Sequence, residues 1–338
     1  MSASDMQPTL SVVIPVFNEE QWIVRCVDSL MVAIARAGWS AQVVVVDDGS
    51  TDGTAAALSD LAARHGVTVV GQANLGRFEA RKAGLAKAAG SHVLLLDSRV
   101  IIDPDALTYL RGQLADHPER AVWNGHINVA SDGNPYAGFM AGLVKIPWRR
   151  YMADPKLTSF GVEDYDLYPK GTGFFFAPKA LLDGAVMGFD SLYDDIKLAS
   201  DDTGVLRWIV ERERIHLAPD FSATYNGRDT LKKFVAQSYY RGTTYVDSYL
   251  TSPGPARTAL FGALGVGAVG AVVALRRPVT AIAAGVAGSA AAGVVVRRCG
   301  ATASEARAVS TLLPLFAGGF GAGVIRGLVL ALRARLRR

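Results

Sequence analysis

Short hydrophobic runs alternate with amphipathic stretches over the first hundred residues of the chain. Four runs rich in Val, Leu and Ile predict buried strands, and between them apolar residues recur at helical spacing. This alternation requires parallel strands joined by right-handed crossovers, so it predicts an α/β, doubly wound, Rossmann-like sheet. The predicted strands and helices lie, in chain order, at 10–16, 20–37, 42–47, 54–64, 67–70, 77–89 and 92–96.

The pattern weakens in the middle of the chain. Pro104 follows Asp103 where a helix would begin, with proline in its first turn. Residues 123–169 mix aromatic residues, glycine and proline with polar residues, and we expect an irregular region that flanks a site and sets specificity. Further elements are predicted as strands at 174–176 and 215–218 and as helices at 202–212 and 231–249.

The last quarter of the chain is dominated by Ala, Gly, Val and Leu. Two apolar runs at 258–275 and 279–296 each have about the minimum length that spans a bilayer. Gly285, Ser289 and Gly293 recur at every fourth position, a spacing that lets membrane helices approach closely. We therefore expect a hairpin of two packed spans, with a soluble Ala/Gly-rich hairpin as the alternative.

A third apolar segment at 308–332 contains Pro314 and Arg326, so it spans the membrane or lies at its interface. Two spans return the chain to its starting side and leave the terminal arginines inside, as the positive-inside rule prefers, although Arg276 and Arg277 at the outer turn oppose it. We expect two spans and a re-entrant or interfacial third segment, in a multi-pass protein of the cell membrane. Residues 1–250 then form a cytoplasmic catalytic domain, because no signal peptide is evident, and residues 251–338 form the membrane region.

Charge and cysteine content exclude several classes of function. The formal net charge of +4 is small, and no stripe of Lys and Arg interleaved with aromatic residues occurs, so nucleic acid is not an expected partner. The chain has only two cysteines, Cys26 and Cys299, which excludes a disulfide framework and a thiolate zinc site.

Polar side chains follow directly after three of the predicted strands. Asp47 and Asp48 end a run of four valines, Asn18-Glu19 follows the first strand, and Asp97 follows the run at 93–96. Ligands bind at the carboxyl ends of the strands in open α/β sheets. These groups are therefore expected to form one polar site at a single sheet edge.

The residues of these motifs and their order along the chain resemble those of the family-2 glycosyltransferases. The chain reads PVFNE at 15–19, VVDDGSTDGT at 45–54 and NLGRFEARKAGL at 74–85, and the resemblance continues through 171–173, 188–190 and 201–202. It covers roughly residues 8–250. The resemblance implies a GT-A fold with a mixed sheet, followed here by C-terminal transmembrane or interfacial helices.

The resemblance also assigns donor-binding residues. Carboxylates at the strand ends accept hydrogen bonds from a nucleobase and a ribose, and arginines reach phosphates, although Asp48 could instead cap the next helix and the arginines could be a solvated helix face. The donor-binding residues implied are Pro15, Phe17, Glu19, Asp47, Asp48, Arg77, Arg81, Asp97 and Arg99.

The metal motif of the family is altered. An Asp-x-Asp pair is expected after the fourth strand, but this chain has Asp97-Ser98-Arg99. Either Arg99 pairs with the diphosphate and makes a Mg²⁺ or Mn²⁺ ion less important, or Arg99 points away and Asp97 holds the ion with help from Asp103 or water. Both alternatives remain open at this point.

Acceptor chemistry is assigned to two further segments. By resemblance, Asp202 is the general base of an inverting transfer and Asp201 its neighbour, with helix capping and a slip to Asp194-Asp195 as alternatives. A Gln-x-x-Arg-Trp motif has only an imperfect counterpart in Gln237, Tyr240 and Arg241, whose tyrosine could equally belong to an aromatic belt at the membrane. These three residues and Gly173 are the candidates for the acceptor and diphosphate site.

The sequence thus predicts an inverting transferase that moves a sugar from a nucleotide diphosphate to a hydroxyl of a lipid-linked or membrane-associated glycan, in cell-envelope polysaccharide or glycolipid synthesis. A polyprenyl-phosphate sugar transferase is one alternative, and a non-catalytic nucleotide-sugar-binding scaffold is another. A transporter module has little support from so few spans, and a homo-oligomer is compatible with the small-residue spacing.

Overall fold

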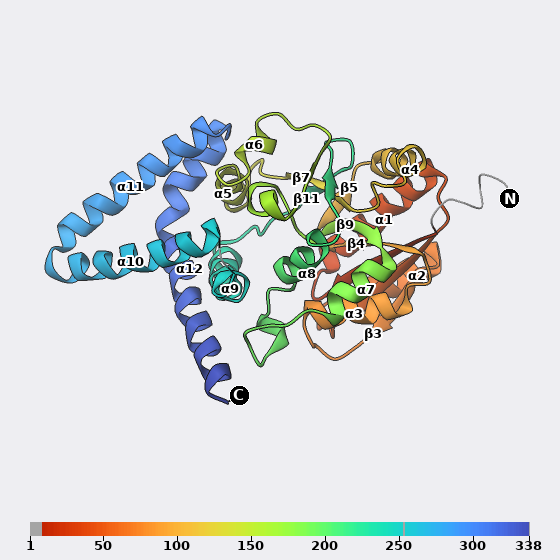
Figure 1. Ribbon diagram of the computed structural model, residues 1–338, viewed down its shortest axis with the longest axis horizontal. Helices are drawn as coiled ribbons and strands as arrows, with labels where there is room; N and C mark the ends of the chain where they lie inside the picture. The colour runs from red at the N-terminus through yellow and green to blue at the C-terminus, as the bar shows by residue number, and fades with distance from the viewer. Residues whose placement is uncertain (1–8, 253, 338) are drawn as a thin grey trace.

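A computed structural model describes residues 9–337 except residue 253, and its ribbon shows a mixed sheet in the N-terminal part, with the long C-terminal helices to one side of it (Figure 1). The main sheet has eight strands in the order β3-β2-β1-β4-β9-β6-β10-β8. Its strands are β1 (Leu10–Val16), β2 (Ala41–Asp47), β3 (Thr68–Gly71), β4 (His92–Leu96), β6 (Trp123–Asn124), β8 (Thr158–Phe160), β9 (Phe174–Pro178) and β10 (Ile215–Leu217).

The N-terminal half of the sheet follows the predicted pattern. β1 is buried along its whole length and pairs in parallel with both β2 and β4, and β2 pairs in parallel with β3. Strands that are buried on both faces have continuous apolar sequences, and the run of valines in β2 therefore identifies it as a strand. The helices between these strands are α1 (Glu20–Ala37), α2 (Thr54–His65) and α3 (Arg77–Lys87).

Beyond β4 the sheet is mixed rather than parallel. β9 runs antiparallel to both β4 and β6, and β10 pairs in parallel with β6 and antiparallel to β8. Phe174, Phe175 and Phe176 of β9 are buried on the two faces of the sheet. Two helices, α7 (Lys179–Met187) and α8 (Asp201–Val210), pack against each other on the side of Phe175.

A second, three-stranded sheet was not predicted. Its strands are in the order β5-β11-β7 and comprise β5 (Val100–Ile102), β11 (Ser222–Tyr225) and β7 (His126–Val129). Each has only three or four residues, too few to show an alternating pattern. The helix expected at Pro104 begins later, as α4 (Ala106–Asp116), so the proline precedes it.

The expectation that residues 123–169 are irregular is wrong in part. This region contains β6, β7, β8, the apolar helix α5 (Pro135–Val144), the short helix α6 (Arg149–Met152) and a 3-10 turn at Val162–Leu167. Asn134 caps α5 by accepting hydrogen bonds from the amides of Tyr136 and Ala137, and Pro135 occupies the first turn. The capping signal was present, but the surrounding glycines and aromatic residues obscured it.

The C-terminal part is helical. α9 (Leu231–Tyr249) is followed by α10 (Pro255–Arg276), α11 (Pro278–Arg298) and α12 (Ala303–Arg337). The last three are long and apolar enough to cross a membrane by length and composition. Figure 1 shows α10 and α11 diverging from their shared turn rather than packing along their lengths, so the predicted packed hairpin is not observed.

The third apolar segment is an uninterrupted helix. α12 contains Pro314 within its 35 residues and packs along α9, α5 and α11, and in Figure 1 it runs across the base of the α10/α11 hairpin. Gly293 of α11 meets Ser310 and Ala306 of α12, so the small-residue spacing of α11 serves this helix pair rather than the hairpin.

Glycines allow α12 and α9 to pack backbone against backbone. A Cβ atom at Gly323 would collide with the carbonyl oxygen of Tyr239, and one at Gly242 would collide with the carbonyl oxygen of Phe320. Thr243 adds a hydrogen bond from its Oγ1 to the Gly323 carbonyl at 3.2 Å. The two helices therefore form one tightly packed unit.

We predict that Gly323→Ala lowers the free energy of unfolding by about 1–3 kcal/mol, since the added methyl group forces the helices apart. The matched control is Gly321→Ala in the same helix, where a Cβ meets nothing within 4 Å. Thermal unfolding of the detergent-purified protein measures both variants. Equal stability of the two would contradict the close packing of α9 on α12.

Candidate functional site

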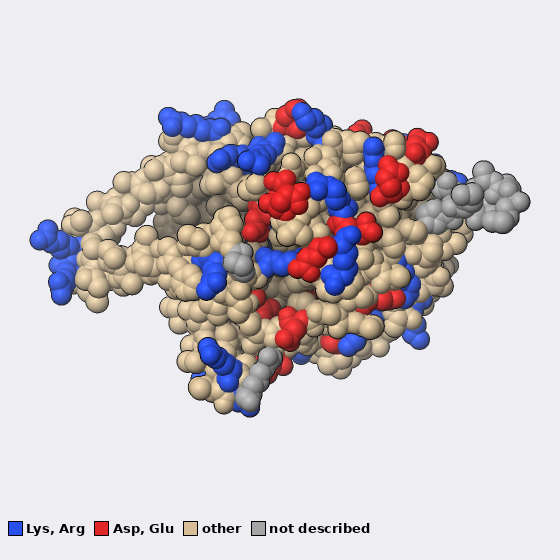
Figure 2. Space-filling view, viewed as in Figure 1, with Lys and Arg blue, Asp and Glu red and all other residues tan. Residues whose placement is uncertain are grey.

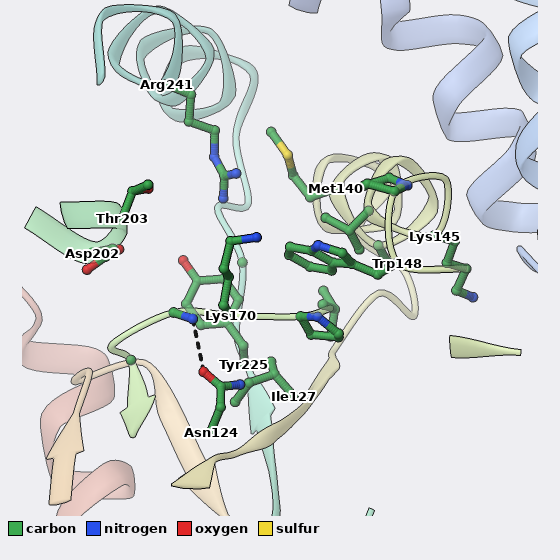
Figure 3. A pocket seen from close by; sticks show the side chains of 18 of the residues that line it. Asn124, Ile127, Met140, Lys145, Trp148, Lys170, Asp202, Thr203, Tyr225 and Arg241 are labelled. Atoms are coloured by element: carbon green, nitrogen blue, oxygen red, sulfur yellow. Dashed lines mark hydrogen bonds between the residues drawn. The ribbon is translucent and has the colours of Figure 1, made fainter. Parts of the chain in front are cut away.

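A cavity of about 940 Å³ extends from the carboxyl end of β4 to the helical C-terminal part. One end is polar and contains Asp97, Arg77 and Asp202. The other end is lined by Met140 and Trp148 from the α5–α6 region and by the first turns of α10 (Figure 3). The cavity thus joins a charged centre to a largely apolar compartment beside the first candidate membrane helix.

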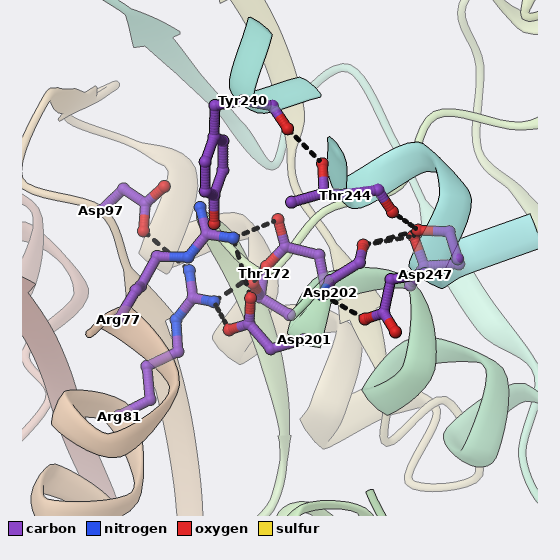
Figure 4. A network of polar contacts seen from close by, with 12 residues as sticks. Arg77, Arg81, Asp97, Thr172, Asp201, Asp202, Tyr240, Thr244 and Asp247 are labelled. Atoms are coloured by element: carbon purple, nitrogen blue, oxygen red, sulfur yellow. Dashed lines mark hydrogen bonds and ion pairs between the residues drawn. The ribbon is translucent and has the colours of Figure 1, made fainter. Parts of the chain in front are cut away.

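The charged centre consists of two arginines from α3 and three aspartates. Arg81 binds Asp97 through Nη2 at 2.9 Å, and its Nη1 binds Asp201 at 2.6 Å and Asp202 at 2.8 Å. Arg77 Nη2 lies 2.8 Å from Asp201 and 3.3 Å from Asp202 (Figure 4). The structure therefore brings together five residues singled out from the sequence, from three distant segments.

Burial and pairing set the charge state of Asp202. Burial alone would raise the pKa of Asp202, but Arg77 and Arg81, together with a hydrogen bond from the Thr172 hydroxyl, hold it well below its ordinary value. Asp202 is therefore a carboxylate at every physiological pH. In this arrangement its oxygens are occupied by cationic and hydroxyl donors.

Two donors in this cluster lack partners. The Nε atoms of Arg77 and Arg81 are buried and make no hydrogen bond with any described residue. Buried donors without partners are costly, and they are commonly satisfied by a ligand. Figure 4 also shows the phenol of Tyr240 directed at Arg77 from α9.

Asp48 has a structural role in the described residues. Its two carboxylate oxygens accept hydrogen bonds from the amides of Leu75 and Gly76, at 2.8 and 2.9 Å, and from the Gln72 side chain. Asp47 accepts one from the Ser50 amide at 2.9 Å. Asp48 thus anchors the turn that starts α3, directly before Arg77. This corresponds to the capping alternative for Asp48, except that the helix it supports is α3.

Arg99 is buried in an ion pair with Glu19. Its Nε donates to Glu19 at 2.7 Å, and its Nη1 lies 3.4 and 3.3 Å from the carbonyl oxygens of Asn226 and Gly227. The guanidinium also lies over the ring of Trp22, and Arg228 binds Glu19 from the other side at 3.2 Å. Arg99 is absent from the cavity lining, so the structure places it apart from the Asp97 cluster.

The residues present do not match an all-carboxylate metal site. Within residues 9–337 apart from 253, no three of His, Cys, Asp and Glu form a group that could hold a metal ion. One oxygen of Asp97 is paired with Arg81, and Asp103 accepts a hydrogen bond from the Ser222 hydroxyl. The cation that pairs with Asp97 is thus a guanidinium.

The acceptor candidates surround the cavity. Gln237, Tyr240 and Arg241 line it from α9, and Figure 3 shows Arg241 reaching into it. The guanidinium of Arg241 has no ion-pair or hydrogen-bond partner among the described residues. Gly173 accepts the Asp97 amide hydrogen at 2.8 Å, and a Cβ there would lie 2.9 Å from the Asp97 carboxylate, so glycine leaves room for that group.

Two further candidates for binding the sugar donor lie at or just beyond the end of β1. Pro15 is buried within β1, paired with Val46, whereas the Phe17 side chain just beyond β1 is 42% exposed. Neither lines the cavity. The cavity therefore contains the residues around Asp97 and Asp202, whereas the candidates at the ends of β1 and β2 lie outside its lining.

Sequence reasoning missed several residues of the site. Thr172 lies within the Gly-Thr-Gly motif and was detectable there, whereas Trp148, Arg228 and Lys170 carry no pattern of their own. Burial lowers the pKa of Lys170 to about 8, although Asp166 opposes this shift. Lys170 also lies over the Tyr165 ring, which fixes it in the cavity wall.

Comparison with known proteins agrees with the family resemblance that the motifs indicate. The model of glycosyl transferase family 2 matches residues 11–168. The chain is 30% identical to the glycosyltransferase GlyA of Streptococcus pneumoniae over 129 residues, which are 38% of this chain and 18% of that protein. It is 33% identical to the undecaprenyl-phosphate 4-deoxy-4-formamido-L-arabinose transferase of Pectobacterium carotovorum over 104 residues, 30% of this chain and 32% of that protein. These matches span less than half of each relative.

The fold is shared with solved glycosyltransferases. The mannosyltransferase PcManGT of Pyrobaculum calidifontis, solved with GDP-mannose and Mn²⁺, superposes with a TM-score of 0.55 over 95% of this chain and 87% of that one, at 17% identity. At this identity the likeness establishes the fold alone. The expected mixed α/β sheet of the GT-A type is confirmed.

We predict that Arg81→Met lowers the free energy of unfolding by about 3–5 kcal/mol, because it leaves buried carboxylates without their counter-ion. The control Arg36→Met removes the exposed pair with Asp105, whose side chains are 53% and 77% exposed, and should leave stability nearly unchanged. Chemical denaturation measures the difference. Equal stability of the two variants would contradict a charge-balanced buried cluster.

Proposed function

We propose that this chain, whose residues 11–168 match the model of glycosyl transferase family 2 and whose fold is of the GT-A type, moves a sugar from a nucleotide diphosphate to an acceptor held at a membrane. The observation that supports this proposal is the continuity of the cavity. It runs from Asp97 and Asp202 to the first turns of α10, a helix apolar enough to cross a bilayer. A soluble acceptor would not require such an apolar compartment.

We assign the donor to the ends of β1 and β2 and to the arginines of α3. A nucleotide needs hydrogen-bond acceptors for its base and ribose, and in this proposal Asp47 and the backbone around Phe17 supply them. The diphosphate needs positive charge as the leaving group departs. Arg77 is better placed than Arg99 for this role, since Arg99 is held by Glu19 and the Arg77 Nε lacks a partner.

A divalent cation is a second source of that charge. PcManGT was solved with Mn²⁺, but Asp97 in this chain is paired with a guanidinium and has no neighbouring carboxylate set of the usual kind. The proposed reaction therefore has no step through a metal ion. The two arginines of α3 provide the electrostatic stabilisation in the proposed reaction.

The proposed transfer inverts the anomeric centre. An acceptor hydroxyl attacks the anomeric carbon, the bond from that carbon to the diphosphate oxygen breaks, and the hydroxyl proton passes to Asp202. When the diphosphate engages Arg77, Asp202 loses one of its cationic partners, and its basicity rises as the leaving group becomes neutralised. Asp201 keeps Arg81 in place through the 2.6 Å ion pair.

The helical tail supports a membrane-bound enzyme. α10 has 22 residues and spans roughly 33 Å, about the thickness of a hydrocarbon core. α10 and α11 project away from the catalytic part, and basic side chains gather at their far turn, where Arg276 and Arg277 lie (Figure 2). We propose that these two helices enter the membrane and that α12 lies along its interface, with the catalytic part on the cytoplasmic side.

A phosphate acceptor is the second candidate, and one observation favours it. Asp202 is paired with two arginines and has a lowered pKa, which makes it a weak base, whereas the phosphate of a polyprenyl phosphate is already ionised and needs none. The unpaired guanidinium of Arg241 in the cavity suits such an anion. The hydroxyl acceptor and the phosphate acceptor differ in their pH dependence.

We predict that the detergent-purified protein with membrane lipids releases nucleotide from a panel of nucleotide sugars, and that Asp202→Asn slows release about 10²–10⁴-fold. The control Asp183→Asn, in the half-buried α7 pair with Lys179 outside the cavity, should retain full activity. Release that survives EDTA supports arginine-based neutralisation. Donor binding without turnover under every condition would contradict an enzyme and favour a nucleotide-sugar-binding scaffold.

The pH profile of kcat/KM distinguishes the acceptors. If Asp202 accepts a hydroxyl proton, activity falls only below the ordinary aspartate pKa of 3.8, and Arg77→Gln, which removes a charge that lowers the pKa of Asp202, moves this limb to higher pH. If the acceptor is a phosphate monoester, activity falls below about pH 6 as the phosphate takes up its second proton. An acid limb near pH 6 that Arg77→Gln does not move would overturn the hydroxyl acceptor.

A further inference from the structure

We infer that Asp247 of α9 is a positioning residue that holds the first turn of α8, and with it Asp202, against the cavity. The inference rests on the proposed function, in which Asp202 takes part in transfer. Asp247 belongs to none of the motifs that the sequence offers for the reaction. It does not line the main cavity.

The carboxylate of Asp247 gathers the chain segment that leads into α8. Its Oδ1 accepts hydrogen bonds from the Ser191 hydroxyl at 2.9 Å and from the Leu192 amide at 2.7 Å, and its Oδ2 accepts one from the Ser200 amide at 2.7 Å. Figure 4 shows Asp247 beside the start of α8, on the far side of Asp202 from the arginines. One side chain thus fixes both ends of the segment 191–200.

This segment has little structure of its own. It contains only a single 3-10 turn at Ile196–Leu198. Ser200, the residue before α8, makes no capping hydrogen bond with its side chain, so the first turn of α8 lacks the usual side-chain cap. The amide of Ser200 itself donates a hydrogen bond to Asp247 of α9, and the Ser248 hydroxyl lies 2.6 Å from the Ser200 hydroxyl.

The helix that carries Asp247 is itself held firmly. α9 packs on α12 through Gly242 and Gly323, and Tyr193 donates a hydrogen bond to the Thr243 carbonyl at 2.6 Å. A carboxylate on such a helix is a fixed anchor for the first turn of α8. The arginines of α3 bind Asp201 and Asp202 on one side, and Asp247 binds the start of the first turn of α8 on the other.

The chemistry of the three contacts makes the carboxylate specific. All three groups are donors, and an aspartate offers acceptor oxygens to each of them. In Asp247→Asn one oxygen becomes an NH₂ group, which faces an N–H donor and forms no hydrogen bond with it. One end of the segment 191–200 is then no longer bound to α9, and Asp202 moves away from the reacting atoms.

The test measures transfer and donor affinity of Asp247→Asn in the full-length detergent-purified protein. We expect kcat to fall about 10- to 100-fold, as for a displaced catalytic group, while KM for the nucleotide sugar stays within about twofold. The matched control Asp183→Asn removes a carboxylate that pairs with Lys179 on α7, a helix that also packs against α8, and should leave kcat unchanged. Unchanged kcat in Asp247→Asn overturns the inference.

A double-mutant cycle separates positioning from a general structural role. If Asp247 acts through Asp202, adding Asp247→Asn to Asp202→Asn causes little further loss of kcat. If the two losses multiply, or if donor affinity and thermal stability fall together with kcat, Asp247 is a folding residue and the inference is wrong.

Hydrogen exchange keeps the inference testable if the protein shows no turnover. In that case the proposed function fails, but Asp247→Asn should still accelerate amide exchange in residues 190–204 and leave the strands of the main sheet unchanged. Unaltered exchange in that segment overturns the contact between Asp247 and the start of α8.

Discussion

The site is organised around a buried guanidinium. Arg81 is 4% exposed and is the common partner of Asp97, Asp201 and Asp202, which come from the end of β4 and the start of α8. Without this cation the three carboxylates would repel one another at close range. The acidic start of α8 can therefore lie close to Asp97 because α3 places a positive charge between their carboxylates.

This arrangement changes the meaning of the altered metal motif. The residue that replaces the second aspartate, Arg99, pairs with Glu19 just beyond β1, whereas the cation paired with Asp97 is Arg81, from a different motif. A guanidinium offers directed hydrogen bonds that a metal ion does not, and it cannot dissociate. Substitution of the motif residue therefore does not imply a lost activity.

The sequence predicts most of the sheet and few of the contacts. β1, β2 and β4 are buried on both faces and so appear as uninterrupted apolar runs, while β5, β7 and β11 are too short to show a period. The pairing of Arg99 with Glu19 joins residues 80 positions apart, and that of Arg77 with Asp201 joins residues 124 positions apart. Nothing in either local sequence specifies the partner, so only the folded chain reveals which carboxylate each arginine neutralises.

The helical tail also shapes the site directly. α12 supports α5 through the buried ion pair of Glu305 with Lys145, at 2.8 Å, and supports α9 through its glycines. Both supported helices line the cavity, since α5 supplies Met140 and α9 supplies Arg241. A boundary at residue 250 thus divides the chain by composition but not by packing. Because the walls of the apolar compartment rest on α12, the proposed position of that helix at the membrane and the shape of the proposed acceptor site depend on the same contacts.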